Sequence, residues 1–275
     1  MESITLMSGM NSVYIISQLL IGLTLGTLIG MTGIGAGILI MPALLFVSQI
    51  EPSMAIGTAL LLEMFTKLFG SFAHWKLGNV DKETSFYFSL GSIPGVLAIS
   101  FLINTLKKII PEDEFNLYIK IIVAVMLCVV CIYLIWDSFK KNQRTVFRSN
   151  DPLTGIQKAK GTVLGGVVGA TVSATSIGAG VFMIPVLTGV FKLSAQRAVG
   201  SSILISVIIT LVGSGVYLFY GNINVVVAIL LMIGTLPGVR IGSKISHKLP
   251  EIVLRRLITG LAVFSFISML VSIKN

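Results

Sequence analysis

The chain has 275 residues, of which 55% are hydrophobic and only 11% are charged, and its mean hydropathy is +0.97. Soluble domains carry roughly 25% charged residues, so this composition excludes an ordinary soluble domain and predicts an all-α integral membrane protein. The formal net charge of +9 does not predict nucleic-acid binding, because the Lys and Arg residues lie in loops between apolar stretches, where such residues set the membrane orientation.

The N-terminal region carries no sign of a cleaved secretory signal. Residues 1–12 contain Glu2 instead of a basic segment, and the first apolar stretch runs on without a cleavage site. We therefore expect the first membrane segment to be retained. The chain contains ten predominantly apolar stretches, including this first segment, with five in each half: residues 13–32, 34–47, 55–75, 86–106 and 117–136, then 161–175, 177–191, 198–220, 225–239 and 254–273.

The first two stretches of the second half are short. A helix needs about 20 residues to cross a hydrocarbon core of about 30 Å, and residues 161–191 cannot hold two such spans with a glycine break between them. This pair, and its counterpart in the first half, is predicted to form a helical hairpin or two broken half-helices that meet inside the membrane. The total is then eight to ten segments.

The chain contains an internal repeat at a gapless offset of 143 residues, which places Gly180 on Gly37. GIGAGILIMPAL at residues 33–44 aligns with SIGAGVFMIPVL at residues 176–187. The same register pairs Gly57 with Gly200, Gly70 with Gly213, Gly78 with Gly221, Gly91 with Gly234, and Pro94-Gly95 with Pro237-Gly238. We therefore divide the chain into a first transmembrane repeat (1–136), a linker (137–160) and a second transmembrane repeat (161–275).

The basic linker predicts the orientation. Residues 137–160 contain six Lys or Arg residues against two acids, so the linker is expected in the cytoplasm. Counting five segments per half from there places the N-terminus outside and gives the two repeats opposite orientations. Lys107 and Lys108 fall outside in this scheme, against the rule, although three acids at residues 112–114 lie close by.

Inverted repeats with glycine- or proline-interrupted segments at matching positions point to a transporter site near the bilayer midplane. The helices that follow Gly37 and Gly180 would direct unpaired backbone N–H groups toward a common point, which favours an anion. The alternative is that the glycines only allow close helix packing. The candidate substrate-binding residues are Thr32, Gly33, Gly35, Gly37, Thr175, Ser176, Gly178 and Gly180, with Thr58 and Ser201 as hydroxyl groups that would complete the site. For these last two, a hydrogen bond to their own helix is the alternative.

Two ionisable residues fall inside an apolar stretch. Glu63 and Lys67 are one helical turn apart, so they can form an ion pair with each other. Glu63 is a candidate for binding a coupling proton, and the alternative is a pair that only orients its helix. Arg240 is expected to extend toward the cytoplasmic interface, or to attract anions there.

Other polar and aromatic residues have structural interpretations. His74, Tyr217, Tyr220 and Trp136 are expected at the membrane interface. Cys128 and Cys131 form a CxxC inside an apolar stretch without further polar ligands, which favours packing residues over a metal or redox site.

With the repeat defined, the sequence resembles the sulfite exporter TauE/SafE family, also called the toluene sulfonate uptake permease family. The residues that carry the resemblance are GIGAGILIMPALL and IGAGVFMIPVL, each followed by AxGT or AxGS at residues 55–58 and 198–201, and PGVRIGSKISHKLP from Pro237. It covers nearly the whole chain. The resemblance implies a membrane transporter for small sulfur-containing or organic anions and brings no catalytic residues with it. The chain departs from the family pattern at Ser176, Ala36, Ala179 and Arg240.

These observations predict a multi-pass protein of the cell (inner) membrane that moves a small anion, a sulfur oxyanion or organosulfonate, by alternating access. The alternatives are an ion channel and a membrane sensor that transports nothing. A membrane-embedded enzyme is not expected, because two histidines near segment ends and no paired intramembrane acids make no catalytic set. No cofactor and no metal are predicted. The expected partners are the anionic solute and the bilayer, with no nucleic acid, and a homodimer is left open.

Overall fold

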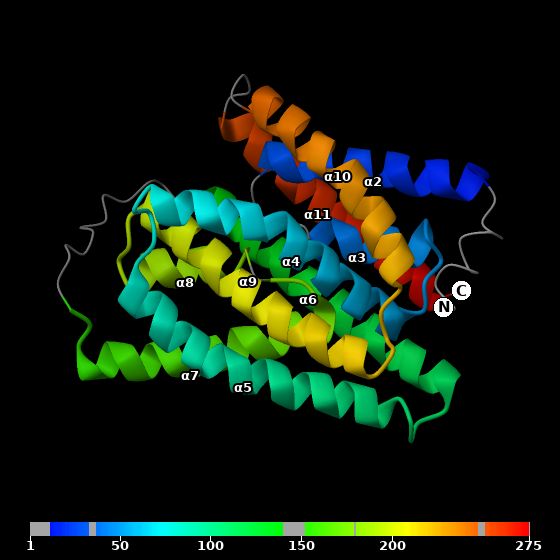
Figure 1. Cartoon of the computed structure of the whole chain (residues 1–275), viewed down its shortest axis with the longest axis horizontal. Helices are drawn as coiled ribbons and strands as arrows, with labels where there is room; N and C mark the ends of the chain where they lie inside the picture. Colours follow the sequence, from blue (N-terminus) through cyan, green and yellow to red (C-terminus); the bar gives the residue numbers. More distant parts are fainter. Residues whose placement is uncertain (1–11, 33–36, 140–151, 179, 247–250, 275) are drawn as a thin grey trace.

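The computed structural model describes residues 12–32, 37–139, 152–178, 180–246 and 251–274, and these residues form ten α-helices without strands (Figure 1). The helices are α2 (Ser12–Thr32), α3 (Gly37–Phe46), α4 (Pro52–Lys76), α5 (Lys82–Leu106), α6 (Glu112–Phe139), α7 (Gly155–Thr175), α8 (Met183–Gly189), α9 (Ala195–Phe219), α10 (Val225–Ser246) and α11 (Glu251–Lys274). Within these residues, seven helices are long and apolar enough to cross a bilayer, namely α2, α4, α5, α6, α9, α10 and α11. The prediction of an all-α membrane protein is confirmed.

Local sequence signals set several helix starts. The side chain of Asp81 caps α5 by accepting a hydrogen bond from the backbone N–H of Thr84. Thr154 and Gln157 form a capping box at the start of α7, and Ser194 caps α9. Each cap satisfies backbone donors that the first turn of a helix leaves unpaired.

The α2–α3 and α7–α8 pairs are helical hairpins with one long and one short arm. In the first, the hydroxyl of Ser48, just after α3, donates a hydrogen bond of 2.8 Å to Gln18 Oε1 near the start of α2. In the second, a Cβ added at Gly161 near the start of α7 would lie 3.4 Å from the Phe191 ring, just after α8. Each chain segment therefore returns to the end of the bundle where it began. At 1.5 Å per residue, α3 and α8 are only about 15 Å and about 10 Å long, too short to span.

Glycines bring helices from the two halves of the chain into backbone contact. On α2, Gly22, Gly26 and Gly30 face the backbone of α10, and a Cβ at any of them would lie 2.3–2.4 Å from a carbonyl oxygen of that helix. Gly165 and Gly169 of α7 face α5 in the same way. Small residues at this spacing are the usual means of close helix approach in membranes. The two sequence halves are therefore interlocked, each sending its first helix onto the other.

The helix boundaries follow the offset found in the sequence. Helices α2, α4 and α5 begin 143 residues before α7, α9 and α10 (Ser12 and Gly155, for example). Gly78 and Gly221, which are paired by the same offset, both adopt positive φ, at 70° and 75°. The opposite membrane orientation of the halves remains a prediction.

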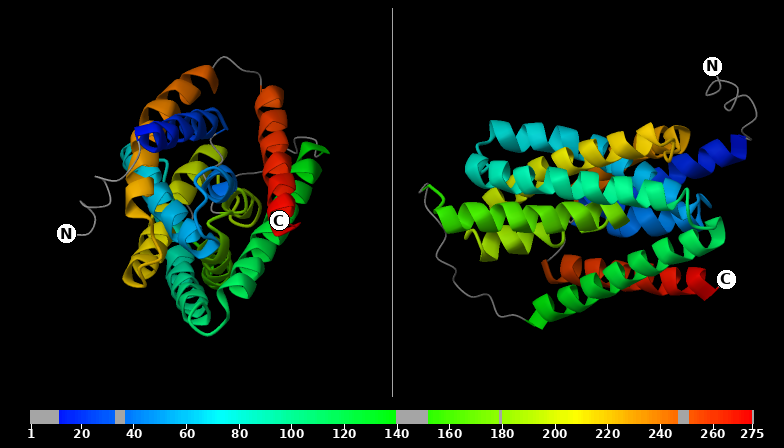
Figure 2. Two further views of the ribbon diagram at one scale, coloured as in Figure 1. Left: turned by 90° about the vertical axis from the view of Figure 1, so that its right-hand side faces the viewer. Right: turned by 90° about the horizontal axis from the view of Figure 1, so that it is seen from below.

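Helices α4 and α9 pack against each other, the short helices α3 and α8 lie inside the ring of longer helices, and α6 and α11 lie side by side along one flank (Figure 2). Side chains that face outward on this flank are apolar, such as Val125 and Ile132 on α6 and Phe264 on α11, which are 59%, 63% and 68% exposed. A surface of this kind fits hydrocarbon, not water.

One predicted interface residue is a core residue. Tyr217 is fully buried, and its hydroxyl donates a hydrogen bond of 3.0 Å to the carbonyl oxygen of Ser173. The expectation for Tyr217 was wrong because a buried carbonyl offers the hydroxyl a partner that the linear sequence does not reveal.

Candidate functional site

The glycine segments of the two repeats meet inside the bundle. Gly37 is the first residue of α3, and Ser176 directly follows α7. A Cβ added at Gly37 would lie 1.9 Å from the Ser176 carbonyl oxygen, so only glycine fits there. We call the contact of Gly37 with Ser176 the glycine junction.

The end of α7 is shaped by local hydrogen bonds. Ser176 caps the helix in the left-handed conformation, with φ of 55° and ψ of 12°. The hydroxyl of Thr175 donates to the carbonyl of Thr171 at 2.8 Å and accepts from the backbone N–H of Ile177 at 3.1 Å. Gly178 follows with φ of 107°, a conformation that side chains avoid. Thr175, Ser176 and Gly178 are all buried.

The Glu63–Lys67 pair lies at the glycine junction. Lys67 Nζ is 2.6 Å from Glu63 Oε2, and the side chains are 12% and 1% exposed. The other carboxylate oxygen, Oε1, accepts a long hydrogen bond of 3.5 Å from the Ser176 hydroxyl. A Cβ at Gly37 would lie 2.6 Å from the same oxygen. The carboxylate thus lies at the N-terminus of α3, where the first backbone N–H groups have no partner within the helix and the helix dipole is positive.

Glu63 is near the middle of the 25-residue helix α4, and so near the bilayer midplane if α4 spans. Its counterparts in the repeat register are hydroxyl residues: Ser206 corresponds to Glu63 and Thr210 to Lys67, both buried on α9. The charge pair is therefore a feature of the first repeat alone.

Thr58 and Ser201 occupy equivalent positions in the two repeats, and they lie far apart. Thr58 Oγ1 accepts a hydrogen bond of 2.9 Å from the backbone N–H of Asn224, and Ser201 Oγ accepts one of 2.9 Å from the N–H of Asp81. Thr58 is in the second turn of α4 and Asp81 lies beyond its end, so about 27 Å of helix separates them. One small solute cannot contact both hydroxyls, and each already holds the turn before α10 or α5.

The remaining predicted site residues are placed less completely. Gly33 and Gly35 lie outside the described residues, and Thr32 is described only as the last residue of α2. Gly180 is half-buried in a turn. Helix α8 begins at Met183, not directly after Gly180 as expected, because residues 180–182 form a turn, and the Phe182 N–H bonds to the Gly178 carbonyl at 3.1 Å.

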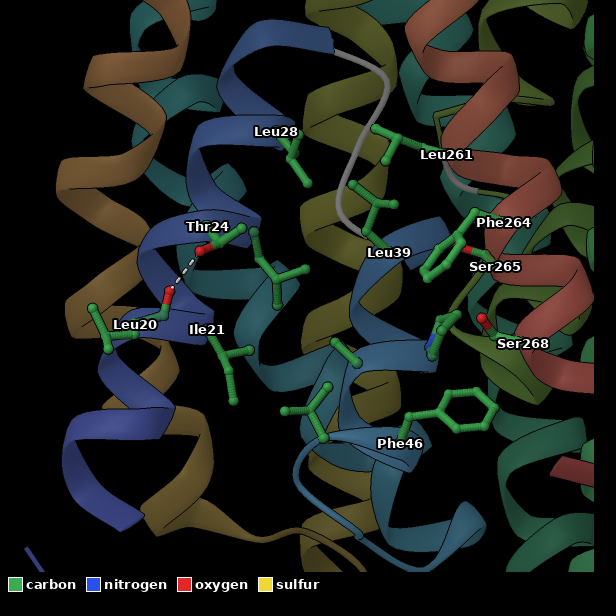
Figure 3. Close-up of a pocket in the computed structure, with 14 residues that line it drawn as sticks. Leu20, Ile21, Thr24, Leu28, Leu39, Phe46, Leu261, Phe264, Ser265 and Ser268 are labelled. Carbon is green, nitrogen blue, oxygen red and sulfur yellow. Dashed lines mark hydrogen bonds between the residues drawn. The ribbon is translucent and has the colours of Figure 1, made fainter. Parts of the chain in front are cut away.

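Two apolar crevices flank the bundle at equivalent positions. The larger, of about 430 Å³, lies between α2, α3 and α11 and is lined mainly by Leu, Ile and Phe side chains, with the hydroxyls of Thr24, Ser265 and Ser268 (Figure 3). Thr24 donates to the Leu20 carbonyl of its own helix. The smaller, of about 260 Å³, lies between α6 and α7 and reaches Thr175. Neither crevice offers the charge that an anion requires.

A second buried polar cluster was not predicted from the sequence. Lys107 Nζ lies 2.8 Å from Glu51 Oε1 and donates to Ser53 and to Asn222. The amide of Asn222 in turn donates to Asn104. Polar amides within or beside apolar stretches are the signal that would have indicated it. The pairing with Glu51 also neutralises the charge of Lys107, which falls outside in the predicted orientation.

Among the described residues, no group of three or more His, Cys, Asp or Glu side chains is placed to hold a metal ion. Within this part of the chain, the chemistry available at the glycine junction is one ammonium, one carboxylate, one hydroxyl and a helix N-terminus.

Comparison with known proteins decides the family. The model of the family described as "Sulfite exporter TauE/SafE" matches residues 18–269, nearly the whole chain. The chain belongs to the sulfite exporter TauE/SafE family. The resemblance drawn from the glycine segments is thereby confirmed.

Relatives within the TauE/SafE family carry names that agree. The chain is 30% identical over 233 residues to the Bacillus subtilis protein "Probable membrane transporter protein YjnA". The matched region covers 85% of this chain and 91% of that protein. The chain is 27% identical over 242 residues to YunE, of the same description and organism, covering 83% and 87%. A Haemophilus influenzae protein named "Probable membrane transporter protein" is 28% identical over 197 residues, which cover 69% of this chain and 68% of that protein. No solved structure matches the chain. This TauE/SafE protein is a multi-pass membrane transporter and not an enzyme.

Proposed function

We propose that the protein is a secondary transporter that binds a small anion at the glycine junction and carries it across the cell (inner) membrane by alternating access. The observation that carries this proposal is the meeting of Gly37 and Ser176, from opposite repeats, beside the partly buried ammonium of Lys67. A site at the interface of two repeats, near the midplane and at helix ends, is the arrangement that secondary transporters use.

The donors at the junction suit an oxyanion. The ammonium of Lys67 supplies a positive charge, the Ser176 hydroxyl supplies a donor, and the first backbone N–H groups of α3 add a helix N-terminus. The family description, sulfite exporter, favours a sulfur oxyanion or an organosulfonate as the substrate class. Thr175, Gly178 and Gly180 belong to the segment that follows α7 or ends it, and Thr32, Gly33 and Gly35 stay candidate residues of the other repeat.

The interlocked packing suggests which parts move together. Helix α2 is in backbone contact with α10, and α5 with α7, so each rigid pair contains one helix from each repeat. We infer that alternating access rocks these mixed pairs around the glycine junction. In the predicted orientation, the N-terminus is outside and the 137–160 linker is cytoplasmic.

Counterflow in liposomes tests this proposal. With the membrane potential held at zero by potassium and valinomycin, vesicles loaded with unlabelled sulfite and diluted into labelled sulfite should accumulate label transiently, which a channel or a sensor cannot produce. Gly37→Val should abolish counterflow, because its side chain would overlap the Ser176 backbone and the Glu63 carboxylate. Gly215→Val is the matched control, since a Cβ at Gly215 meets no atom within 4 Å. Equal counterflow in the two variants would refute the site.

A further inference from the structure

We propose that the Glu63 carboxylate occupies the place of the transported anion in the empty site, so that a proton and a monovalent anion must bind together and cross as an electroneutral pair. This inference rests on the proposed function and adds its coupling ion.

The carboxylate already has the ligands that the anion would need. One of its oxygens lies 2.6 Å from Lys67 Nζ, and the other lies at the Ser176 hydroxyl and the N-terminus of α3. Ammonium, hydroxyl and helix N-terminus are therefore all directed at a group of the protein itself. A solute anion can bind the ammonium, the hydroxyl and the helix N-terminus only after the carboxylate no longer interacts with them.

The net charge of the site determines how the anion can displace the Glu63 carboxylate from these groups. In the empty site, the Glu63–Lys67 ion pair has no net charge. An anion entering beside an ionised Glu63 would leave the buried site with a net negative charge, which is costly in a low-dielectric region. If Glu63 takes up a proton from solvent as the anion binds, the pair becomes a neutral acid and a Lys67 ammonium with the anion, and the net charge is again zero.

The surroundings offer no other group for this exchange. The segment 33–46, which includes α3, contains no ionisable residue, and the end of α7 contributes hydroxyls. On α9, Ser206 and Thr210 are the counterparts of the pair, while Arg197 is held by Asp81.

Cationic groups on the other neighbouring helices lie away from the pair. On α10, Arg240 is exposed and is 16 residues beyond Asn224, whereas Glu63 is only five residues beyond Thr58, which bonds to Asn224. On α6, Lys120 donates to the Ser272 carbonyl. Glu63 is thus the titratable anion and Lys67 the cation at the junction.

The test uses the full chain in liposomes that enclose a pH-sensitive dye, with methanesulfonate as the probe because it carries one negative charge at every pH used. In the wild type, an inward methanesulfonate gradient should acidify the lumen, and uptake should not respond to a potassium-valinomycin potential. Glu63→Gln should lose acidification to the level of empty liposomes, and its methanesulfonate uptake should become sensitive to the potassium-valinomycin potential. Glu83→Gln, at a partly exposed ion pair with Lys158, is the control and should behave as the wild type.

Glu63→Gln leaves a lysine without its buried partner, so folding needs a second variant. Glu63→Gln/Lys67→Met removes both charges; it should fold, and it should lose counterflow as well as acidification. Counterflow with acidification in Glu63→Gln, or wild-type counterflow without acidification, would overturn the coupling and leave the anion transporter standing. Absence of wild-type counterflow with both sulfite and methanesulfonate would overturn the coupling and the anion transporter.

Discussion

The hydroxyl of Thr58 accepts a hydrogen bond of 2.9 Å from the backbone N–H of Asn224. Its repeat counterpart Ser201 accepts one of the same length from Asp81, so the two hydroxyls hold the turns that connect α9 to α10 and α4 to α5. Both residues belong to the AxGT and AxGS patterns that follow the glycine segments. The pattern therefore marks a cross-repeat clamp as well as the neighbourhood of a binding site.

Thr58→Val should destabilise the protein by about 1–3 kcal/mol, because it keeps the shape of the side chain and leaves a buried N–H group without its acceptor. Thermal unfolding in detergent measures the change. Ser243→Ala is the control, since the exposed Ser243 hydroxyl bonds only to the carbonyl of Arg240 in its own helix. Similar unfolding temperatures for the two variants would show that the clamp contributes nothing.

Gly26→Leu should prevent folding or cost about 3 kcal/mol, because a Cβ at Gly26 would lie 2.3 Å from the Thr235 carbonyl oxygen on α10. Gly260→Leu, on an exposed face of α11 where a Cβ meets nothing within 4 Å, should leave yield and stability unchanged. Size-exclusion profiles and melting curves separate the two. A monodisperse, stable Gly26→Leu protein would contradict the α2–α10 packing.

The repeat predicted much of the fold. One offset located the equivalent helices, the paired turns at Gly78 and Gly221, and the two hairpins, because a duplicated sequence repeats its local structure. The meeting of Gly37 with Ser176 could be expected only in outline, since a sequence does not state which atoms two distant loops bring together.

The misses have the same origin. Tyr217 is a polar residue near a helix end, which fits an interface residue, but its long-range hydrogen bond to the Ser173 carbonyl places it in the core. Thr58 and Ser201 also bond to distant backbone groups, and their part in a binding site stays a prediction. The later start of α8 reflects the turn at Gly178, whose φ is 107°, and its repeat counterpart Gly35 lies outside the described residues.

Lys107→Met should cost about 1–3 kcal/mol, because it removes the ammonium from Glu51 and leaves the Asn222 carbonyl oxygen without its donor. Lys108→Met is the matched neighbour; its ammonium lies only over the Tyr220 ring, at 4.9 Å, and the loss should be below about 1 kcal/mol. Melting temperatures at one salt concentration give the comparison. If Lys108→Met proves the more harmful substitution, the polar cluster around Lys107 is not a stabilising element.

The predicted orientation is tested by cysteine labelling in a background with Cys128 and Cys131 replaced by Ala. Ile109, in the turn between α5 and α6, and Leu77, in the turn between α4 and α5, are 72% and 71% exposed. Ile109→Cys should react with an impermeant maleimide on intact cells, and Leu77→Cys only after permeabilisation. The reverse pattern would invert the topology and place the 137–160 linker outside.

A thermal-shift screen of the purified protein tests whether a small anion binds at the glycine junction. Sulfite, sulfate, thiosulfate, sulfoacetate, methanesulfonate and small carboxylates form the panel, because a ligand that binds only the folded state raises the unfolding temperature. In the wild type and in Glu83→Gln, we expect a rise in unfolding temperature that is selective for a sulfur oxyanion or sulfonate. In Glu63→Gln/Lys67→Met we expect no rise. An equal shift in the double variant, or no shift with any anion in the panel, would contradict anion binding at the glycine junction.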